Sequence, residues 1–215
     1  MQPRFEQNVC HIPSRPAANP FALELAPYAC LPCLVAMPHS LARMELLLQG
    51  TVVNLGAIAE VVKRDASLAA QVLRLANRNR EECDRFYRIE ACVVQLGISE
   101  LRELVRTTPP LSPADARSHA LLNHSRLTAL GAETIAFQIP GADPEKAYLG
   151  GLLHALPELA SLAAETEIDE WPLPTFIWEV IRGFRHPFTV ARRENRLCEL
   201  VRAACEWTTR LGGPA

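Results

Sequence analysis

Two histidines in the second half of the chain have the clearest capacity for chemistry. His124 and His154 are each expected on a helix, and neutral imidazoles that face each other across two helices can ligate a metal ion. The alternative is that each ring is buried and hydrogen-bonded to a neighbour, which is the commoner state of a core histidine. His186 is a third candidate ligand. Spacing alone leaves both alternatives open.

A second motif, Cys30-Leu31-Pro32-Cys33, has the spacing of redox-active and zinc-binding cysteine pairs. No strand is expected before it, and no second pair completes a four-cysteine zinc site. Cys30 and Cys33 are therefore candidates for a redox or zinc switch, with a structural turn as the alternative. The seven cysteines follow no export segment, so we expect a reducing cytoplasm and thiols that are mostly buried apolar groups.

Arginines accumulate in the last third of the chain. They are Arg182, Arg185, Arg192, Arg193, Arg196, Arg202 and Arg210, against the acidic Glu194, Glu199 and Glu206. A basic face of this kind can bind phosphate or a partner, and the alternative is a solvated helix exterior with ion pairs inside the helix. Trp178 falls outside the apolar stripe of its expected helix, which predicts an exposed ring able to contact a partner.

Composition excludes several classes of protein. The chain carries 22 basic and 24 acidic side chains, so nothing global attracts a polyanion and no nucleic acid partner is expected. No apolar run approaches the roughly 18 residues that cross a membrane. We therefore expect a soluble cytoplasmic protein without a membrane partner.

Apolar residues recur with helical period from Pro38 onward, which predicts an all-α fold. Asn54, Asp65 and Asp143 precede expected helices and can cap them, and Ser112-Pro113-Ala114-Asp115 has the residues of a further helix start. Two prolines at 109 and 110 interrupt the pattern. We predict three segments: an irregular arm over residues 1–29, a first helical lobe over 30–106 and a second over 107–215.

Several stretches resemble the HDOD domain family, the HD-related output domains. Residues 61–77 resemble the family's Asp-Pro-x-Leu turn and the helix after it that ends in Leu-Ala-Asn, although Ala66 stands where the family has proline. Further likenesses are Leu31-Pro32-Cys33-Leu34, Gly97-Ile98 followed by Leu101-Arg102, Gly151-Leu152-Leu153-His154, and Trp171-Pro172-Leu173-Pro174. The resemblance covers roughly residues 31–205 and implies a multi-helical fold whose second half is a degenerate, shortened HD-like lobe.

The departures from the HD pattern bear on catalysis. HD phosphohydrolases bind metal through a histidine, a His-Asp pair and a later aspartate, and the resemblance places His124, His154 and His186 at relic positions of such a site. Ala155 stands where the aspartate belongs, and Arg185-His186 replaces a His-His pair. Hard divalent ions need anionic oxygen ligands. The resemblance therefore implies no catalytic residues, no bound metal and no cofactor.

The favoured hypothesis is a non-catalytic regulatory module of HDOD type in bacterial signal transduction, which binds a signalling protein or an unidentified ligand. The alternatives are a metal-dependent phosphohydrolase that uses the three histidines, and the cysteine switch described above. The candidate contact residues are Asp65, Asn77, Trp178, Arg185, Arg192 and Arg193. Because the second lobe is shortened by a helix relative to the HD pattern, an uncovered apolar surface there would favour a homodimer.

Overall fold

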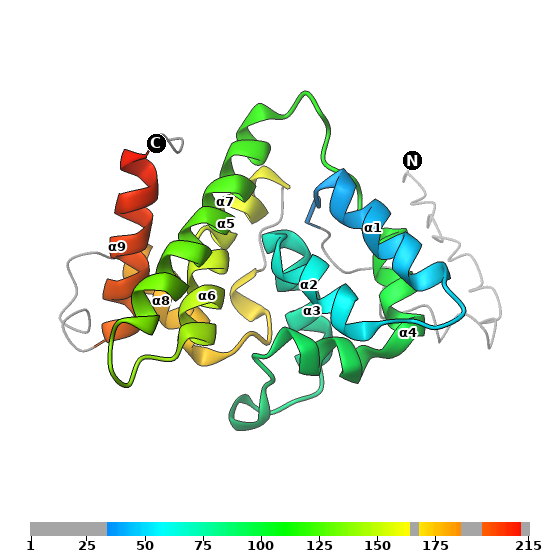
Figure 1. Cartoon of the computed structure of the whole chain (residues 1–215), viewed down its shortest axis with the longest axis horizontal. Helices are drawn as coiled ribbons and strands as arrows, with labels where there is room; N and C mark the ends of the chain where they lie inside the picture. The colour runs from blue at the N-terminus through cyan, green and yellow to red at the C-terminus, as the bar shows by residue number, and fades with distance from the viewer. Residues whose placement is uncertain (1–33, 164–167, 186–194, 212–215) are drawn as a thin grey trace, which may run out of the picture. The chain divides into compact units, whose positions relative to one another are not determined.

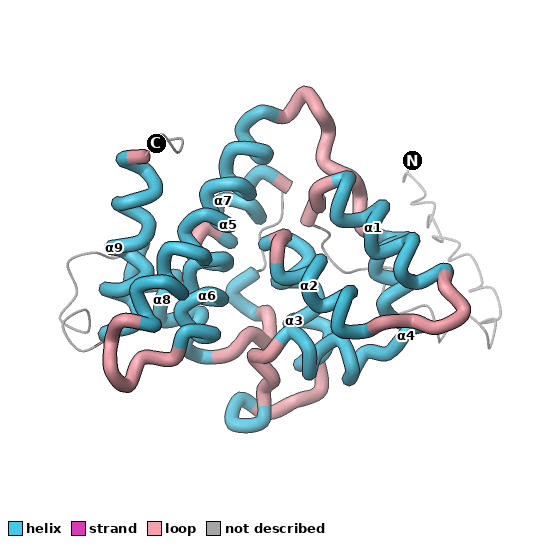
Figure 2. The backbone as a smooth tube through the Cα atoms, viewed as in Figure 1, coloured by secondary structure: helices cyan, strands magenta, loops and turns pink. Residues whose placement is uncertain are grey.

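A computed structural model describes residues 34–163, 168–185 and 195–211, which all belong to one compact unit. Regular structure in these residues is helical apart from one isolated bridge (Figures 1 and 2), so the predicted all-α class is confirmed. The predicted arm over residues 1–29 and the Cys30–Cys33 pair lie outside the described residues. The division into two lobes near residue 107 stays a prediction.

The first three helices begin where the sequence supplies a helix-start residue, which is a proline for α1 and a capping side chain for α2 and α3. Helix α1 (Pro38–Gln49) starts with a proline, whose missing N–H costs no hydrogen bond in a first turn. In α2 (Leu55–Lys63), Asn54 accepts a hydrogen bond from the N–H of Ala57 at 3.0 Å. Asp65 caps α3 (Ala66–Asn77), and every residue of α3 is buried. Helix α3 packs against α2 and α4 as well as α5, α6 and α7, so it is the central helix of the described unit.

Helix α4 (Ile89–Thr107) follows the short helix η2 (Glu82–Asp84) and bends at Gly97. The φ angle of Gly97 is 71°, a left-handed conformation that glycine adopts without a steric penalty. The Gly97-Ile98 step that resembles the family is thus a kink within one helix. After α4, the N–H of Leu111 donates to the carbonyl of Ala36 at 2.8 Å, and this bridge ties the start of the described chain to the segment between α4 and α5.

Helix α5 (Ala116–Phe137) begins one turn later than the sequence pattern predicted. Asp115, and not Ser112, caps it by accepting from the N–H of Ser118 at 3.0 Å. Ser112 instead opens a turn, in which its carbonyl accepts from the N–H of Asp115. Serine, proline and aspartate favour both helix starts and turns, and the pattern could not separate the two.

The remaining helices follow α5 and include those that contact the two histidines. They are α6 (Pro144–Leu153), α7 (Leu156–Leu162), η3 (Ile168–Glu170), α8 (Thr175–Arg185) and α9 (Arg196–Arg210). Helix α6 approaches α5 closely because Gly151 faces it, and a Cβ at Gly151 would lie only 2.8 Å from the Cα of Ala129. Helix α9 packs against both α5 and α6 (Figure 1). In the described part of the chain, no helix is both long and apolar enough to traverse a lipid bilayer.

Candidate functional site

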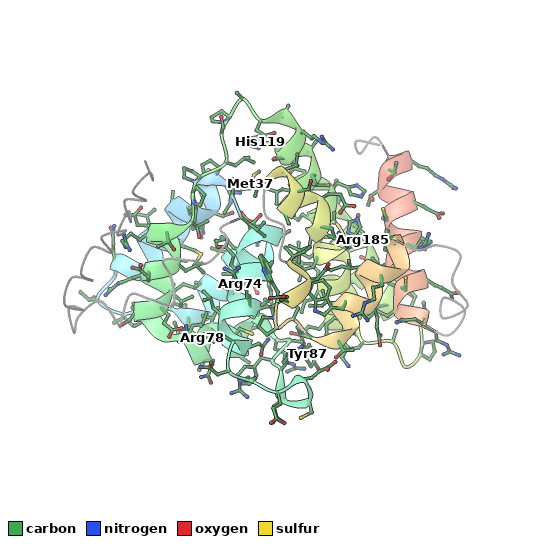
Figure 3. All side chains as sticks on the ribbon, turned by 180° about the vertical axis from the view of Figure 1, so that it is seen from behind. Met37, Arg74, Arg78, Tyr87, His119 and Arg185 are labelled. Atoms are coloured by element: carbon green, nitrogen blue, oxygen red, sulfur yellow. The ribbon has the colours of Figure 1, made fainter. Side chains whose placement is uncertain are left out.

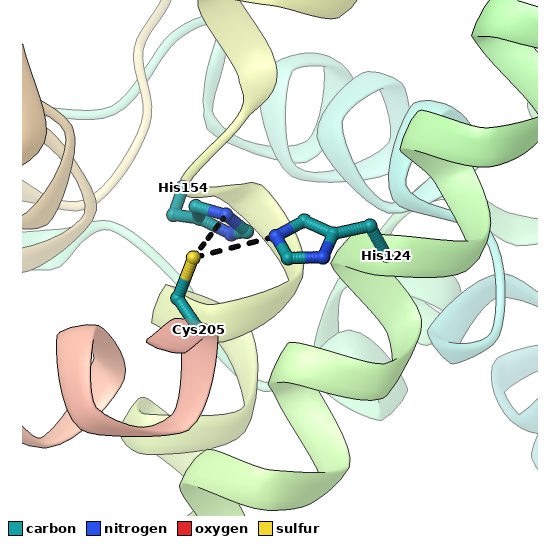
Figure 4. Close-up of side chains that lie close together, drawn as sticks. All are labelled: His124, His154 and Cys205. Atoms are coloured by element: carbon teal, nitrogen blue, oxygen red, sulfur yellow. Dashed lines mark hydrogen bonds between the residues drawn. The ribbon is translucent and has the colours of Figure 1, made fainter. Parts of the chain in front are cut away.

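His124, His154 and Cys205 gather where α5, the end of α6 and α9 meet (Figure 4). The Nε2 atom of His124 lies 3.3 Å from the Sγ atom of Cys205, and the Nε2 atom of His154 lies 3.8 Å from the same sulfur. The two imidazole centroids are 5.3 Å apart. The rings therefore face each other across two helices, as one of the two sequence hypotheses required, and a thiol completes the cluster.

Gly151 fixes the orientation and the tautomer of His154. The Nδ1 atom of His154 lies 2.7 Å from the carbonyl oxygen of Gly151, and because a carbonyl only accepts, Nδ1 carries the proton. The Nε2 atom consequently presents its lone pair to Cys205. Burial lowers the pKa of His154 to about 4, and the ring also packs against Phe184 with centroids 4.9 Å apart. His154 is therefore a neutral imidazole near pH 7.

His124 and Cys205 are also uncharged in the absence of a ligand. Burial lowers the pKa of His124 and raises the pKa of the Cys205 thiol. The Nδ1 atom of His124 is buried and has no hydrogen-bond partner among the described residues, whereas its Nε2 atom lies 3.5 Å from the hydroxyl of Thr128. Within the described part of the chain, the cluster offers nitrogen and sulfur donors and no carboxylate.

The residues around the cluster do not supply the missing oxygen ligand. Ala155 is buried and precedes α7, where its methyl group has nothing to donate to a metal. Arg185 lies exposed at the end of α8, with its guanidinium 3.8 Å from a carboxylate oxygen of Asp169 (Figure 3). His186, Arg192 and Arg193 lie outside the described residues. The described residues of the cluster therefore offer a hard ion no anionic oxygen.

Asp65, a predicted contact residue, is buried and serves the fold. Its carboxylate accepts from the N–H of Met37 at 2.8 Å and from the N–H groups of Ser67 and Leu68 at the start of α3. Burial raises the pKa of Asp65, and these hydrogen bonds act in the opposite direction. Asp65 therefore joins the start of α1 to the start of α3, and the prediction that it contacts a partner is corrected.

Asn77 is likewise fully buried and engaged. Its amide nitrogen donates to the carbonyl of Phe86 at 2.9 Å, and its amide oxygen accepts from the N–H of Phe86 at 2.8 Å. This pair of bonds holds the segment before α4 against the end of α3. The Leu-Ala-Asn ending that marks the family resemblance thus has a structural role, and Asn77 is not available to a ligand.

The predicted exposure of Trp178 is wrong. Its side chain is only 8% exposed, so the buried face of α8, a helix that packs against α6 and α9, is wider than the apolar stripe indicated. The nearby Trp171 is also buried, and the guanidinium of Arg74 lies 4.3 Å from its ring centroid (Figure 3 labels Arg74). The exposed tryptophan of the described residues is Trp207 on α9, at 54%.

A basic pocket lies between α1, α2 and α5, and the sequence motifs do not predict it. It encloses about 430 Å³, and its lining includes Arg43, Arg64 and Arg126 with a single carboxylate, Glu60. None of these three arginines forms an ion pair within the described ranges. Arg43 lies on α1 and Arg64 at the end of α2, whereas Arg126 lies on the more distant α5. No local pattern joins these three arginines, whereas the predicted arginines of the last third are neighbours in sequence.

Cys205 was also missed. It follows His154 by 51 residues and lies on a different helix, so no metal-binding spacing connects them. The only usable signal was the helical register of the last segment, in which Cys205 follows the buried Val201 and Ala204. The fold therefore reveals a third donor that the sequence motifs did not contain.

The described residues form an all-helical domain in which two histidines and a cysteine meet. The family model of the HDOD domain matches residues 34–171, and the chain belongs to this family. The crystal structure of the MmoQ response regulator from Methylococcus capsulatus str. Bath is similar in fold, with a TM-score of 0.64, 16% identity, and coverage of 84% of this chain and 88% of that chain.

A second crystal structure, of fragment 20–298 of MmoQ, has a TM-score of 0.49 at 20% identity and covers 80% of this chain and 69% of that chain. No curated protein matches the sequence. The family resemblance seen in the sequence is thus confirmed. The family match ends at Trp171, so α8, α9 and Cys205 lie beyond it.

Proposed function

We propose that this chain is a non-catalytic regulatory module of a signalling system, which acts by binding a partner protein. The observation that carries the proposal is the donor set at the histidine pair. Two neutral imidazoles and a thiol face one another there, and the position that holds aspartate in an HD hydrolase is the buried methyl group of Ala155. Phosphoester hydrolysis by hard metal ions depends on oxygen ligands, and the described residues of this cluster offer none.

Membership of the HDOD family supports a non-catalytic role, because HD-related output domains are generally non-catalytic. The similar crystal structure carries the name of a response regulator, which is a signalling protein. Because the two sequences are only 16% identical, neither the partner nor the signal of that protein is assigned to this chain.

The basic pocket between α1, α2 and α5 is the surface that we assign to the partner. Three guanidinium groups converge on it with one carboxylate, and none of the three is neutralised by an ion pair within the described residues. Exposed arginines are common in the central contacts of protein interfaces, where they pair with carboxylates of the partner. An acidic segment of a signalling protein fits this pocket.

Charge reversal at the pocket tests the assignment. Arg43→Glu, Arg64→Glu and Arg126→Glu are compared with Arg117→Glu, an exposed arginine on α5 that does not line the pocket. Proteins captured from the native host by the unmodified chain are identified, and each signalling protein among them is purified and titrated directly. We expect at least tenfold weaker binding by each pocket variant and unchanged binding by Arg117→Glu.

The proposal fails if no captured signalling protein binds in the direct titration, or if the pocket variants bind as tightly as the control. Circular dichroism of each variant separates lost binding from lost folding. These exposed side chains are not expected to alter the fold.

The second candidate function is the metal-dependent phosphohydrolase. The facing imidazoles of His124 and His154 favour it, and it predicts turnover of a phosphodiester that disappears in His154→Gln. The third hypothesis, the Cys30–Cys33 switch, falls on residues outside the described ranges. It predicts a disulfide or a bound zinc ion that is lost in Cys33→Ser.

A further inference from the structure

We propose that His124, His154 and Cys205 form a binding site for a zinc ion that joins α5, the end of α6 and α9. This inference goes beyond the regulatory function proposed above and does not depend on it. The donor set is also unlike that of a hydrolytic HD site, because a thiol replaces the carboxylates and comes from a helix outside the family match.

The distances in the cluster fit a tetrahedral zinc ion. With Zn–N bonds of about 2.0 Å and Zn–S bonds of about 2.3 Å, nitrogen and sulfur ligands in a tetrahedral site lie roughly 3.5 Å apart. The two imidazole Nε2 atoms lie 3.3 and 3.8 Å from the sulfur of Cys205, on either side of that value. All three donor atoms lie within 4.8 Å of one another, so small rotations of the side chains suffice to place an ion between them.

The hydrogen bonding of His154 prepares it as a ligand. Its Nδ1–H donates to the carbonyl of Gly151, which leaves the Nε2 lone pair directed at the position that the ion would occupy. Ligating histidines in proteins are commonly oriented in this way by a backbone carbonyl behind the ring. Without an ion, the single S–H proton of Cys205 can serve only one of the two facing Nε2 atoms.

The donors select the metal. Imidazole and thiolate ligands suit zinc, whereas magnesium and manganese require oxygen ligands that the described cluster lacks. Binding removes the proton of the Cys205 thiol to solvent as the Zn–S bond forms, and both imidazoles bind in the neutral form. Three protein ligands leave a fourth position for water.

Helices α5 and α9 also frame an open groove beside the site. A groove of about 500 Å³ between these helices is lined by His124, Asn123, Trp207 and Thr208 among others. One of the three ligands therefore borders this groove, and the other two do not line it. Once bound, the ion would fix α9 to the two helices that carry the histidines.

Cobalt(II) is the probe for the experiment, because a thiolate-bound cobalt ion gives a charge-transfer band and a tetrahedral one gives intense d–d bands. The full chain is used with Cys10, Cys30 and Cys33 replaced by serine, so that those thiols cannot bind the ion. We expect one equivalent of cobalt to saturate both sets of bands. One equivalent of zinc should abolish them, and a hundredfold excess of magnesium should leave them unchanged.

Variants locate the site. Cys205→Ser should abolish the charge-transfer band. Loss of a residue that only hydrogen-bonds to a ligand typically weakens metal binding roughly 10- to 100-fold. His154→Gln removes a ligand itself, and should weaken cobalt binding by more than that. Cys83→Ser, which removes an exposed thiol elsewhere, is the matched control and should bind as the parent does. Zinc should raise the melting temperature of the parent and of the control but not that of Cys205→Ser.

Two results would overturn the proposal: a parent protein with no thiolate band, or a band that persists in Cys205→Ser. If Cys205→Ser does not fold, His124→Gln decides the same question through the cobalt titration. The zinc proposal and the regulatory function can fail independently. A zinc site in a protein that hydrolyses no phosphodiester is compatible with the regulatory function. Phosphodiester hydrolysis by a protein that lacks this zinc site would refute the regulatory function as well as the zinc site.

Discussion

Replacement of Gly151 by alanine should separate two helices and disturb the histidine pair. A Cβ at this position would lie 2.8 Å from the Cα and 2.9 Å from the nitrogen of Ala129, and 2.9 Å from the carbonyl oxygen of Thr128. Non-bonded carbon atoms prefer about 3.5 to 4.0 Å, so each contact is short by more than half an ångström. All three neighbours are backbone atoms of α5, and therefore no side chain can move aside.

The cost follows from two opposing effects. Insertion of a methyl group into a packed core typically costs 1–3 kcal/mol, and rigid backbone neighbours place this site near the upper end of that range, at about 3 kcal/mol. Alanine recovers about 1 kcal/mol through its higher helix propensity. The expected net loss in the free energy of unfolding is about 2 kcal/mol, which corresponds to a fall of roughly 4–8 °C in melting temperature for a chain of this size.

The matched control is Gly131→Ala on α5. Its Cβ would meet the Cβ of Ala204 at 3.4 Å and the ring of Trp207 at 3.5 Å, which are near-ordinary contacts, so helix propensity should dominate. We expect Gly131→Ala to be neutral or stabilising by up to about 1 kcal/mol. Urea unfolding of both variants measures the difference. A Gly151→Ala protein as stable as the Gly131→Ala protein would refute the reasoning.

Three further changes test other contacts. Asn77→Asp replaces the amide donor with an oxygen that faces the carbonyl of Phe86, and should lower the free energy of unfolding by about 3 kcal/mol in urea titrations; an unchanged midpoint would contradict this. Asp65→Ala removes a helix cap and leaves the N–H of Met37 without its acceptor. The free energy of unfolding should fall by about 2 to 4 kcal/mol in the same assay, and a fall below about 1 kcal/mol would contradict this role of Asp65. Because burial lowers the folded-state pKa of His154 from 6.5 to about 4, the unfolded chain binds the proton more readily. In metal-free buffer, the contribution of His154 to the free energy of unfolding is complete above pH 6.5 and falls by about 3 kcal/mol as the pH approaches 4. A His154→Gln protein whose free energy of unfolding has the same pH dependence would disprove the assignment.

Local signals in the sequence were sufficient for much of the fold. Asn54, Asp65 and Asp143 cap the helices that they were predicted to cap, because a side-chain acceptor before an apolar stripe meets a requirement that is local to the backbone. The start of α5 was misplaced by one turn, since Ser112 and Asp115 suit both a turn and a cap. Local chemistry alone does not decide between those two outcomes.

The site could be predicted only in part. The histidines at 124 and 154 were visible because a family resemblance marks them, and their neutral state follows from burial that the sequence does not report. Cys205 and the arginines of the basic pocket are brought together by helix packing across long separations in the chain. The exposure of Trp178 was mispredicted for the same reason, since it depends on which helices cover α8.

The most direct test of the regulatory account is a measurement of phosphodiester turnover. The purified chain is assayed with bis(4-nitrophenyl) phosphate and with cyclic dinucleotides, in the presence of magnesium, manganese, iron(II) or zinc, beside His154→Gln as the matched variant. We predict rates that are equal in the two proteins and indistinguishable from those of the metal ions in buffer. A metal-dependent rate in the unmodified chain that disappears in His154→Gln would contradict the account and make the protein a hydrolase.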